Sequence, residues 1–174
     1  MQLKRVVVTG IGALTPIGNN TQDYWKGLLN GVSGAEAITL FDASKFKTRF
    51  ACELKGFDPL NYLDKKEARK VDRYTQIAVA ASDEAVKDAA IDKETMNPDR
   101  IGVVFASGIG GLISFQDEVI AFAKGDGTPR FNPFFIPKMI LDIAAGHISM
   151  RHGFRGPNFA VTSACASSTN AIME

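Results

Sequence analysis

The sequence predicts an α/β fold, with a mixed sheet that has helices on both faces. The β-branched run at 5–9 is followed at once by a glycine, which is typical of a buried strand. Residues 74–90 carry alanines at helical spacing, as expected for a helix packed closely between layers. The run at 101–106 predicts a further buried strand that leads into glycines. Strands that alternate with helical segments in this way indicate an α/β domain.

Composition narrows the functional class. The chain has 174 residues, which is enough for one domain with a proper core. Its net charge of +1 gives no reason to expect nucleic-acid binding, and no apolar run approaches the length of a membrane span. The two cysteines, Cys52 and Cys165, show no disulfide framework and no zinc-site spacing. We therefore expect a cytoplasmic protein without a metal site.

The glycines after the first strand do not complete a dinucleotide-binding motif. Gly10 and Gly12 match its start, but Thr15 stands where the third glycine is required. Pro16 also lies where the motif's helix should be running. We therefore predict no nucleotide site here.

A helix and a second strand are predicted next. Asn20 or Thr21 would cap the helix, Gly31 would end it, and Trp25 would lie on its packed face. Residues 48–54 predict a strand whose alternation turns Cys52 toward the core.

A basic stripe is the main charge feature. If residues 64–73 form one helix, four basic side chains share a face, at spacings of i, i+3, i+4 and i+7: Lys66, Arg69, Lys70 and Arg73. One interpretation is a solvated helix face, the usual role of such a run. The other is a docking surface that attracts an acidic partner.

Two further stretches are candidates for ligand contact. The glycine-rich turn 107–111 follows a strand, where ligands often bind in α/β folds, although a plain tight turn is the alternative. After a predicted loop at 124–130, residues 131–137 hold three phenylalanines and two prolines. Such a cluster lines an apolar tunnel, contributes to a subunit interface or belongs to the core.

Cys165 lies in a strand–turn–helix pattern. An apolar run at 158–162 is followed by small residues and then by the start of a helix. Backbone N–H groups at such a turn favour a thiolate and face an oxyanion that forms when the sulfur attacks a carbonyl. A buried structural cysteine is the alternative. His147 and His152 are the only histidines that a Cys–His pair would use.

The residues around Cys165 resemble a known signature. Gly156-Pro157-Asn158, Val161, Ala164-Cys165-Ala166-Ser167-Ser168 and Ile172 are similar to the active-site motif of the β-ketoacyl synthases, the condensing enzymes of fatty-acid and polyketide synthesis in the thiolase superfamily. The resemblance runs through the whole chain and implies that Cys165 is the nucleophile. It also implies an acyl pocket formed by Ile109, Phe134 and Phe135. It further implies a docking face for acyl carrier protein, formed by Lys66, Arg69, Lys70 and Arg130.

The resemblance also implies an architecture. It predicts roughly the N-terminal half of a thiolase-like, layered αβαβα fold, with residues 1–174 as one domain that stops within the helix after the nucleophile. Full-length members form homodimers, and their two catalytic histidines come well after the cysteine. His147 and His152 do not match those places, so we interpret both as structural. We expect the chain alone to be incomplete and inactive in condensation.

The implied reaction is fatty-acid chain elongation. An acyl group held as a thioester on Cys165 would undergo decarboxylative Claisen condensation with malonyl-acyl carrier protein, without a cofactor. Two alternatives remain open. One is a non-catalytic fragment that binds a carrier protein or a partner subunit. The other is an unrelated cysteine hydrolase that uses Cys165 with His147 or His152.

Overall fold

The computed structural model describes residues 5–174, so residues 1–4 of the predicted domain lie outside the described part. The chain divides into two compact units. Unit 1 comprises the chain up to Asp58 together with Ala80–Ile91, and unit 2 comprises Pro59–Val79 and Asp92–Glu174. Helix α3 (Arg73–Asp88) therefore contributes to both units.

Helix α1 (Thr21–Leu29) begins as the sequence predicts. The Asn20 side chain accepts a hydrogen bond from the Asp23 N–H, and Gly31 follows the helix with φ +64°. Trp25 is 60% exposed, so its predicted core position is wrong. The reason is that α1 packs through Gly27, where an added Cβ would lie 3.0 Å from the Ile17 carbonyl oxygen.

Residues 5–9 do not form the predicted strand. Val6 is 90% exposed and Val8 is 80% exposed, and within the described chain this segment joins no sheet. β-branched residues favour an extended backbone, but a strand also needs a partner to complete its hydrogen bonds. The next residues instead use α3, because the Ile11 N–H donates to Asp88 and the Ala13 N–H donates to Glu84, each at 2.9 Å.

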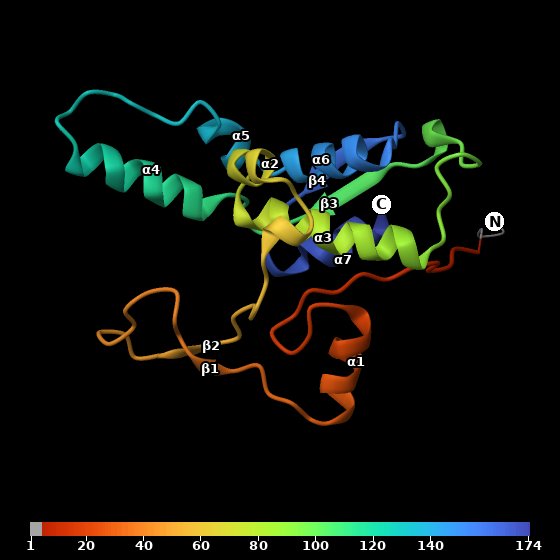
Figure 1. Cartoon of the computed structure of the whole chain (residues 1–174), viewed down its shortest axis with the longest axis horizontal. Coiled ribbons are helices and arrows are strands. Elements are labelled where there is room, and N and C mark those ends of the chain that lie inside the picture. Colours follow the sequence, from red (N-terminus) through yellow and green to blue (C-terminus); the bar gives the residue numbers. More distant parts are fainter. Residues whose placement is uncertain (1–4) are drawn as a thin grey trace. The chain divides into compact units, whose positions relative to one another are not determined.

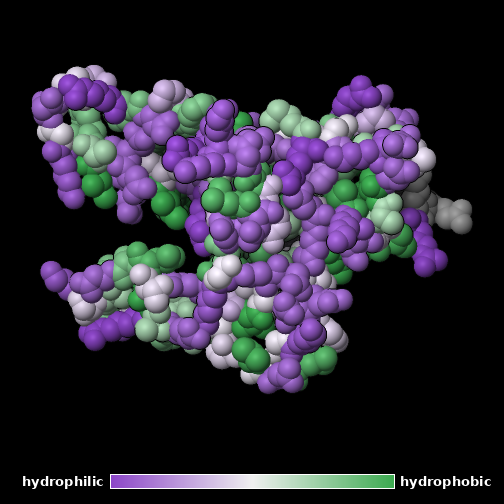
Figure 2. Space-filling view, viewed as in Figure 1, coloured by the Kyte–Doolittle hydropathy of each residue, from purple (hydrophilic) through white to green (hydrophobic). Residues whose placement is uncertain are grey.

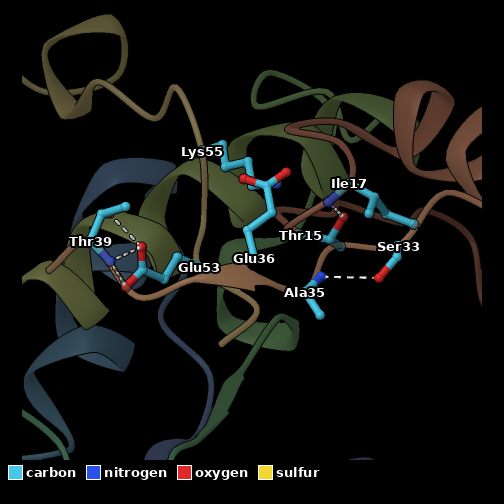
Figure 3. A network of polar contacts seen from close by, with 8 residues as sticks. All are labelled: Thr15, Ile17, Ser33, Ala35, Glu36, Thr39, Glu53 and Lys55. Carbon is cyan, nitrogen blue, oxygen red and sulfur yellow. Dashed lines mark hydrogen bonds and ion pairs between the residues drawn. The ribbon is translucent and has the colours of Figure 1, made fainter. Parts of the chain in front are cut away.

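Strands β1 (Glu36–Ala37) and β2 (Phe50–Ala51) form a short antiparallel pair. The predicted strand at 48–54 is thus reduced to two residues, and Cys52 is exposed, contrary to the prediction. A side chain supplies the missing acceptors (Figure 3). Glu53 accepts hydrogen bonds from the Thr39 N–H and the Thr39 hydroxyl, as Figure 3 shows. It also accepts from the Leu40 N–H, so these two backbone N–H groups are paired without a longer ladder.

Unit 2 is built on two parallel strands, β3 (Val103–Ala106) and β4 (Asn158–Val161). Both strands contact α6 (Ile143–His152) and α7 (Ser167–Met173), which lie on either side of them (Figure 1). Helices thus cover both faces of this sheet, as the sequence predicts.

The core of unit 2 lies between α3, α6 and the short helix α2 (Lys65–Lys70). Ala144 is fully buried and Val79 is 1% exposed. The complete buried cluster consists of Leu63, Ala68, Val71, Ala78, Val79, Ala144 and Ile148.

The predicted single helix over 64–73 is wrong. Helix α2 ends at Lys70, and Val71 is extended (φ −120°, ψ 152°) and only 4% exposed. Asp72 then begins α3, because its carbonyl accepts the Gln76 N–H and its side chain accepts the Tyr74 N–H. Arg73 therefore belongs to α3 and does not extend the basic stripe of α2.

A long hairpin connects β3 to α6. It contains α4 (Leu112–Lys124), the loop that the sequence predicts around 124–130, and α5 (Phe135–Met139) (Figure 1). Several of its apolar side chains are exposed. Figure 2 shows hydrophobic residues, in green, among the hydrophilic residues of the surface. Short 3₁₀ turns occur at Pro59–Asn61, Pro98–Arg100 and Ala164–Ala166. Among residues 5–174, no helix combines the length and apolar character needed to cross a bilayer.

Two glycine-to-alanine substitutions should shift stability in opposite directions. A Cβ at Gly12 would lie 1.9 Å from the Ala81 carbonyl oxygen, so Gly12→Ala should lower the free energy of unfolding by about 1–3 kcal/mol. Gly146 lies inside α6 with nothing within 4 Å of an added Cβ, so Gly146→Ala should raise it by about 0.5–1 kcal/mol. Urea unfolding measures both changes, and an unchanged midpoint for Gly12→Ala would contradict the packing of this segment on α3.

Candidate functional site

Two turns meet at one edge of the β3–β4 sheet. The parallel register places Ala106 opposite Val161, so both strands end together. β3 continues into the glycine turn 107–111, and β4 continues into the turn that carries Cys165. The Thr162 hydroxyl donates a hydrogen bond to the Ser107 carbonyl at 3.3 Å and links the two turns. Ile109 and Cys165, which are far apart in the sequence, thus lie on neighbouring turns at the edge where α/β folds commonly bind ligands.

The cysteine turn is held by side chains of the helix that follows it. The Ser163 N–H donates to the buried Ser167 hydroxyl at 2.8 Å, and that hydroxyl donates to the Ala164 carbonyl at 2.7 Å. The Asn170 amide donates to the Ser163 hydroxyl at 2.7 Å. Ala164 has φ +49°, a left-handed conformation that residues other than glycine seldom adopt and that is frequent at functional sites. Cys165 follows directly and is exposed.

The predicted strand–turn–helix order around the cysteine is confirmed. β4 ends at Val161, a 3₁₀ turn spans Ala164–Ala166, and α7 begins at Ser167. The exposure of Cys165 excludes the alternative of a buried structural cysteine.

The glycine turn requires glycine at two positions. Gly110 has φ +92°, and a Cβ on Gly111 would lie 2.0 Å from the Lys138 carbonyl oxygen. The Gly111 N–H donates to the Met139 carbonyl at 3.1 Å, so the turn lies directly against α5. Ile109 projects outward and is 69% exposed.

The basic residues of α2 line a hollow of about 530 Å³. Asp64 caps this helix, and hydrogen bonds from the Glu67 and Lys66 N–H groups hold the pKa of its carboxyl below the usual value. The Lys70 ammonium lies 5.6 Å from the centre of the Phe134 ring, a distance suited to a cation–π contact. The lining consists of Lys66, Arg69, Lys70, Asn132, Pro133 and Phe134. Phe134, a predicted acyl-pocket residue, thus lies with the predicted docking residues.

Arg130 lies apart from that lining. It forms an exposed ion pair with Asp126, at 3.6 Å, within the loop between α4 and α5. An exposed pair of this kind contributes little to stability.

Phe135 lies at the centre of a row of aromatic rings. Its ring stacks on Phe115 with centroids 6.2 Å apart and on Phe131 at 5.9 Å, and Phe131 in turn contacts Phe122 at 5.5 Å. The two rings from α4, Phe115 and Phe122, are not among the residues predicted from the sequence. The apolar residues of 112–122 recur at helical spacing, and this periodicity was the available signal.

The two histidines occupy other surroundings. His147 lines a pocket of about 310 Å³ with Leu63, Glu67, Lys70, Val79, Met150 and Arg151, and that lining includes no residue of the cysteine turn. Burial lowers the pKa of His147, while the charge of Glu67 acts in the opposite direction. His152 is 6% exposed, and its ring stacks on Phe154 at 5.3 Å. These contacts give no support to a Cys–His pair with Cys165. Across residues 5–174, no cluster of His, Cys, Asp and Glu is suited to hold a metal ion.

The sequence matches known proteins over nearly its full length. Residues 3–174 match the family model described as β-ketoacyl synthase, N-terminal domain. The chain is 47% identical to 3-oxoacyl-[acyl-carrier-protein] synthase 2 of Synechocystis over 99% of this chain and 41% of that protein. It is also 47% identical to the enzyme of the same name from Staphylococcus aureus, over 99% of this chain and 42% of the relative.

Solved structures agree with this assignment. A β-ketoacyl synthase from Burkholderia phymatum superposes with a TM-score of 0.80 at 26% identity, over 98% of this chain and 42% of that one. The structure of a type II PKS acyl-carrier protein in complex with its ketosynthase superposes with a TM-score of 0.78 at 24% identity, over 98% and 45%. These neighbours confirm the predicted thiolase-like α/β fold for an N-terminal portion.

The chain spans about two-fifths of the length of the curated relatives that it matches. Because the family model covers residues 3–174, and with them the Cys165 turn and the glycine turn, the chain belongs to the β-ketoacyl synthase family.

Proposed function

We propose that this chain supplies the nucleophile, part of the acyl pocket and the carrier-docking face of a cytoplasmic 3-oxoacyl-acyl carrier protein synthase. One observation carries the proposal. Cys165 is exposed on a hydrogen-bonded turn, and the turn of Ile109 lies beside it at the same sheet edge. A nucleophile next to an apolar side chain suits a substrate that has a reactive thioester and a hydrocarbon tail.

The first chemical step would be acyl transfer to Cys165. Its sulfur attacks the carbonyl carbon of an acyl carrier thioester and forms a new C–S bond. The bond from that carbon to the carrier's sulfur breaks, and the departing thiolate takes up a proton. The hydrogen bonds of Ser167 fix the turn, so Cys165 is oriented before the substrate arrives.

The second step would lengthen the chain. Malonyl carrier loses carbon dioxide, and the resulting carbanion attacks the carbonyl carbon of the Cys165 thioester. The bond from that carbon to the Cys165 sulfur breaks, which frees the Cys165 thiolate. The product, longer by two carbons, remains on the carrier. His147 lines a separate pocket and His152 is buried against Phe154, so we assign neither to this step. We accordingly expect the chain studied alone to be acylated without completing the condensation.

The basic hollow would receive an acidic acyl carrier protein. Lys66, Arg69 and Lys70 are exposed on one side of α2, and opposite charges of this kind steer encounter and set orientation. Arg130 would join from the neighbouring loop. The related ketosynthase solved in complex with its acyl-carrier protein supports a partner of this class.

The acyl chain would contact Ile109, Phe134 and Phe135. Ile109 adjoins the cysteine turn, whereas Phe135 belongs to the stacked rings of the α4–α5 hairpin. Exposed apolar residues on that hairpin, such as Ile113 at 54% and Phe122 at 44%, suit contact with a second subunit. We therefore propose that the full-length enzyme is a homodimer in which this hairpin approaches the partner.

The basic hollow by itself also favours a second function, a module that binds a carrier or a subunit without catalysis. Such a module would bind carrier protein but leave Cys165 unmodified. The cysteine-hydrolase alternative is not favoured, because His147 lines a separate pocket and the His152 ring stacks on Phe154.

Acyl transfer should modify one of two exposed cysteines. After incubation with an acyl carrier thioester, intact-mass spectrometry should find one acyl group per chain, and peptide mapping should place it on Cys165. Cys165→Ser should abolish the modification, while Cys52→Ser, which removes the other exposed thiol, should leave it unchanged. Equal acylation of both cysteines would reduce the reaction to ordinary thiol exchange and contradict the proposal.

Charge reversal in the hollow should weaken carrier binding. Lys70→Glu should raise the Kd for acyl carrier protein about tenfold, or about 1.4 kcal/mol, and flatten its salt dependence, because an attractive charge becomes repulsive. Lys124→Glu makes the same charge change on α4, outside the lining of the hollow, and serves as the matched control. Equal effects of the two variants in calorimetric titrations would point to a general charge effect and against docking at α2.

A further inference from the structure

A buried carboxylate lies between the basic helix α2 and the glycine turn 107–111. Asp72 is 5% exposed and comes two residues after the end of α2. Its Oδ2 accepts two hydrogen bonds from Ser114, at 2.6 Å from the hydroxyl and 3.0 Å from the N–H. Its Oδ1 accepts the Tyr74 N–H at 3.2 Å. Burial of a carboxylate is unfavourable unless it is hydrogen-bonded, and Asp72 meets that condition through both oxygens.

The two oxygens serve different elements. A helix cap needs only one of them, and Oδ1 performs that role at the start of α3. Oδ2 instead fixes Ser114, the third residue of α4 and three positions after Gly111. Asp72 thus connects the segment that follows the basic helix to the beginning of α4, immediately after the turn that carries Ile109.

Further hydrogen bonds join the same elements. The Tyr74 hydroxyl donates to the Ile140 carbonyl at 2.6 Å, just after α5. The Gln76 side chain donates to the Ala68 carbonyl at 2.9 Å and holds the start of α3 to α2. At the end of the glycine turn, the Gly111 N–H donates a hydrogen bond to the carbonyl of Met139, the last residue of α5, at 3.1 Å. The first turn of α3 therefore touches α2, α4 and the end of α5 through hydrogen bonds.

We propose that Asp72 is a positioning residue that holds the docking helix α2 and the glycine turn 107–111 at a fixed spacing. A carrier protein bound in the basic hollow would then restrain the turn of Ile109 as well as the helix that it touches. This inference rests on the proposed function, because it takes the hollow as the carrier's docking surface. It assigns to Asp72 the transmission of that contact and no contact with substrate.

Backbone hydrogen exchange in the presence of holo-acyl carrier protein without an acyl group tests the proposal. Binding to the wild-type chain should slow exchange about threefold or more at residues 107–114, in addition to α2, because a restrained turn opens less often. Asp72→Asn replaces one acceptor oxygen with an NH₂ group, which donates hydrogen bonds and cannot accept them. The variant therefore cannot keep both the bonds from Ser114 and the bond from Tyr74. This variant should still bind the carrier and should show protection at α2 alone.

Two further variants complete the test. Ser114→Ala removes only the hydroxyl bond and should give partial loss of protection at the turn, so it decides the matter if Asp72→Asn does not fold. Asp117→Asn removes an exposed carboxylate from the same helix and should behave as wild type.

The outcomes separate the inference from the function beneath it. Absence of carrier binding to the wild-type chain overturns both. Binding without protection at 107–114, or full protection in Asp72→Asn or Ser114→Ala, overturns the positioning role alone and leaves docking intact.

Discussion

The register of two parallel strands is the constraint on which the site depends. Ala106 pairs with Val161, so β3 and β4 end at the same edge of the sheet. The register alone therefore makes the two following turns adjacent. A shift of one residue would turn the side chains of β4 to the other face of the sheet. It would also separate Thr162 from the Ser107 carbonyl. The cysteine and the isoleucine are neighbours because the strand ladder makes them so, and the loops only refine their orientation.

Sequence patterns predicted the local features of this arrangement well. The strand before Cys165, the small residues of its turn and the helix after it were all identifiable, because each depends on residues close together in the chain. The strands at 5–9 and 48–54 failed for the opposite reason. Their side chains favour an extended backbone, but pairing depends on distant residues, and here Glu84, Asp88 and Glu53 supplied the acceptors instead. Trp25 was misplaced because one small residue, Gly27, decided which face of α1 packs.

The basic helix shows where pattern reasoning ends. Lys66, Arg69 and Lys70 look the same in sequence whether they are merely solvated or belong to a docking surface. Their position beside Phe134, on which the proposed docking surface rests, is visible only in three dimensions, since that ring comes from a segment more than sixty residues later. Asp72 was also unremarkable in sequence, as one acid among many charges. Its burial and its two bonds to Ser114 arise from the break between α2 and α3, which periodicity did not reveal.

The left-handed backbone of Ala164 limits which substitutions this turn can accept in evolution. An alanine in that conformation carries about 1–2 kcal/mol of strain that a glycine would not. Glycine would relieve the strain, yet it would also widen the range of directions open to the residue that follows. In evolution, a substitution at this position would therefore exchange stability of the folded chain against a fixed orientation of Cys165. Alanine, the smallest side chain that still restricts the backbone, lies between these extremes.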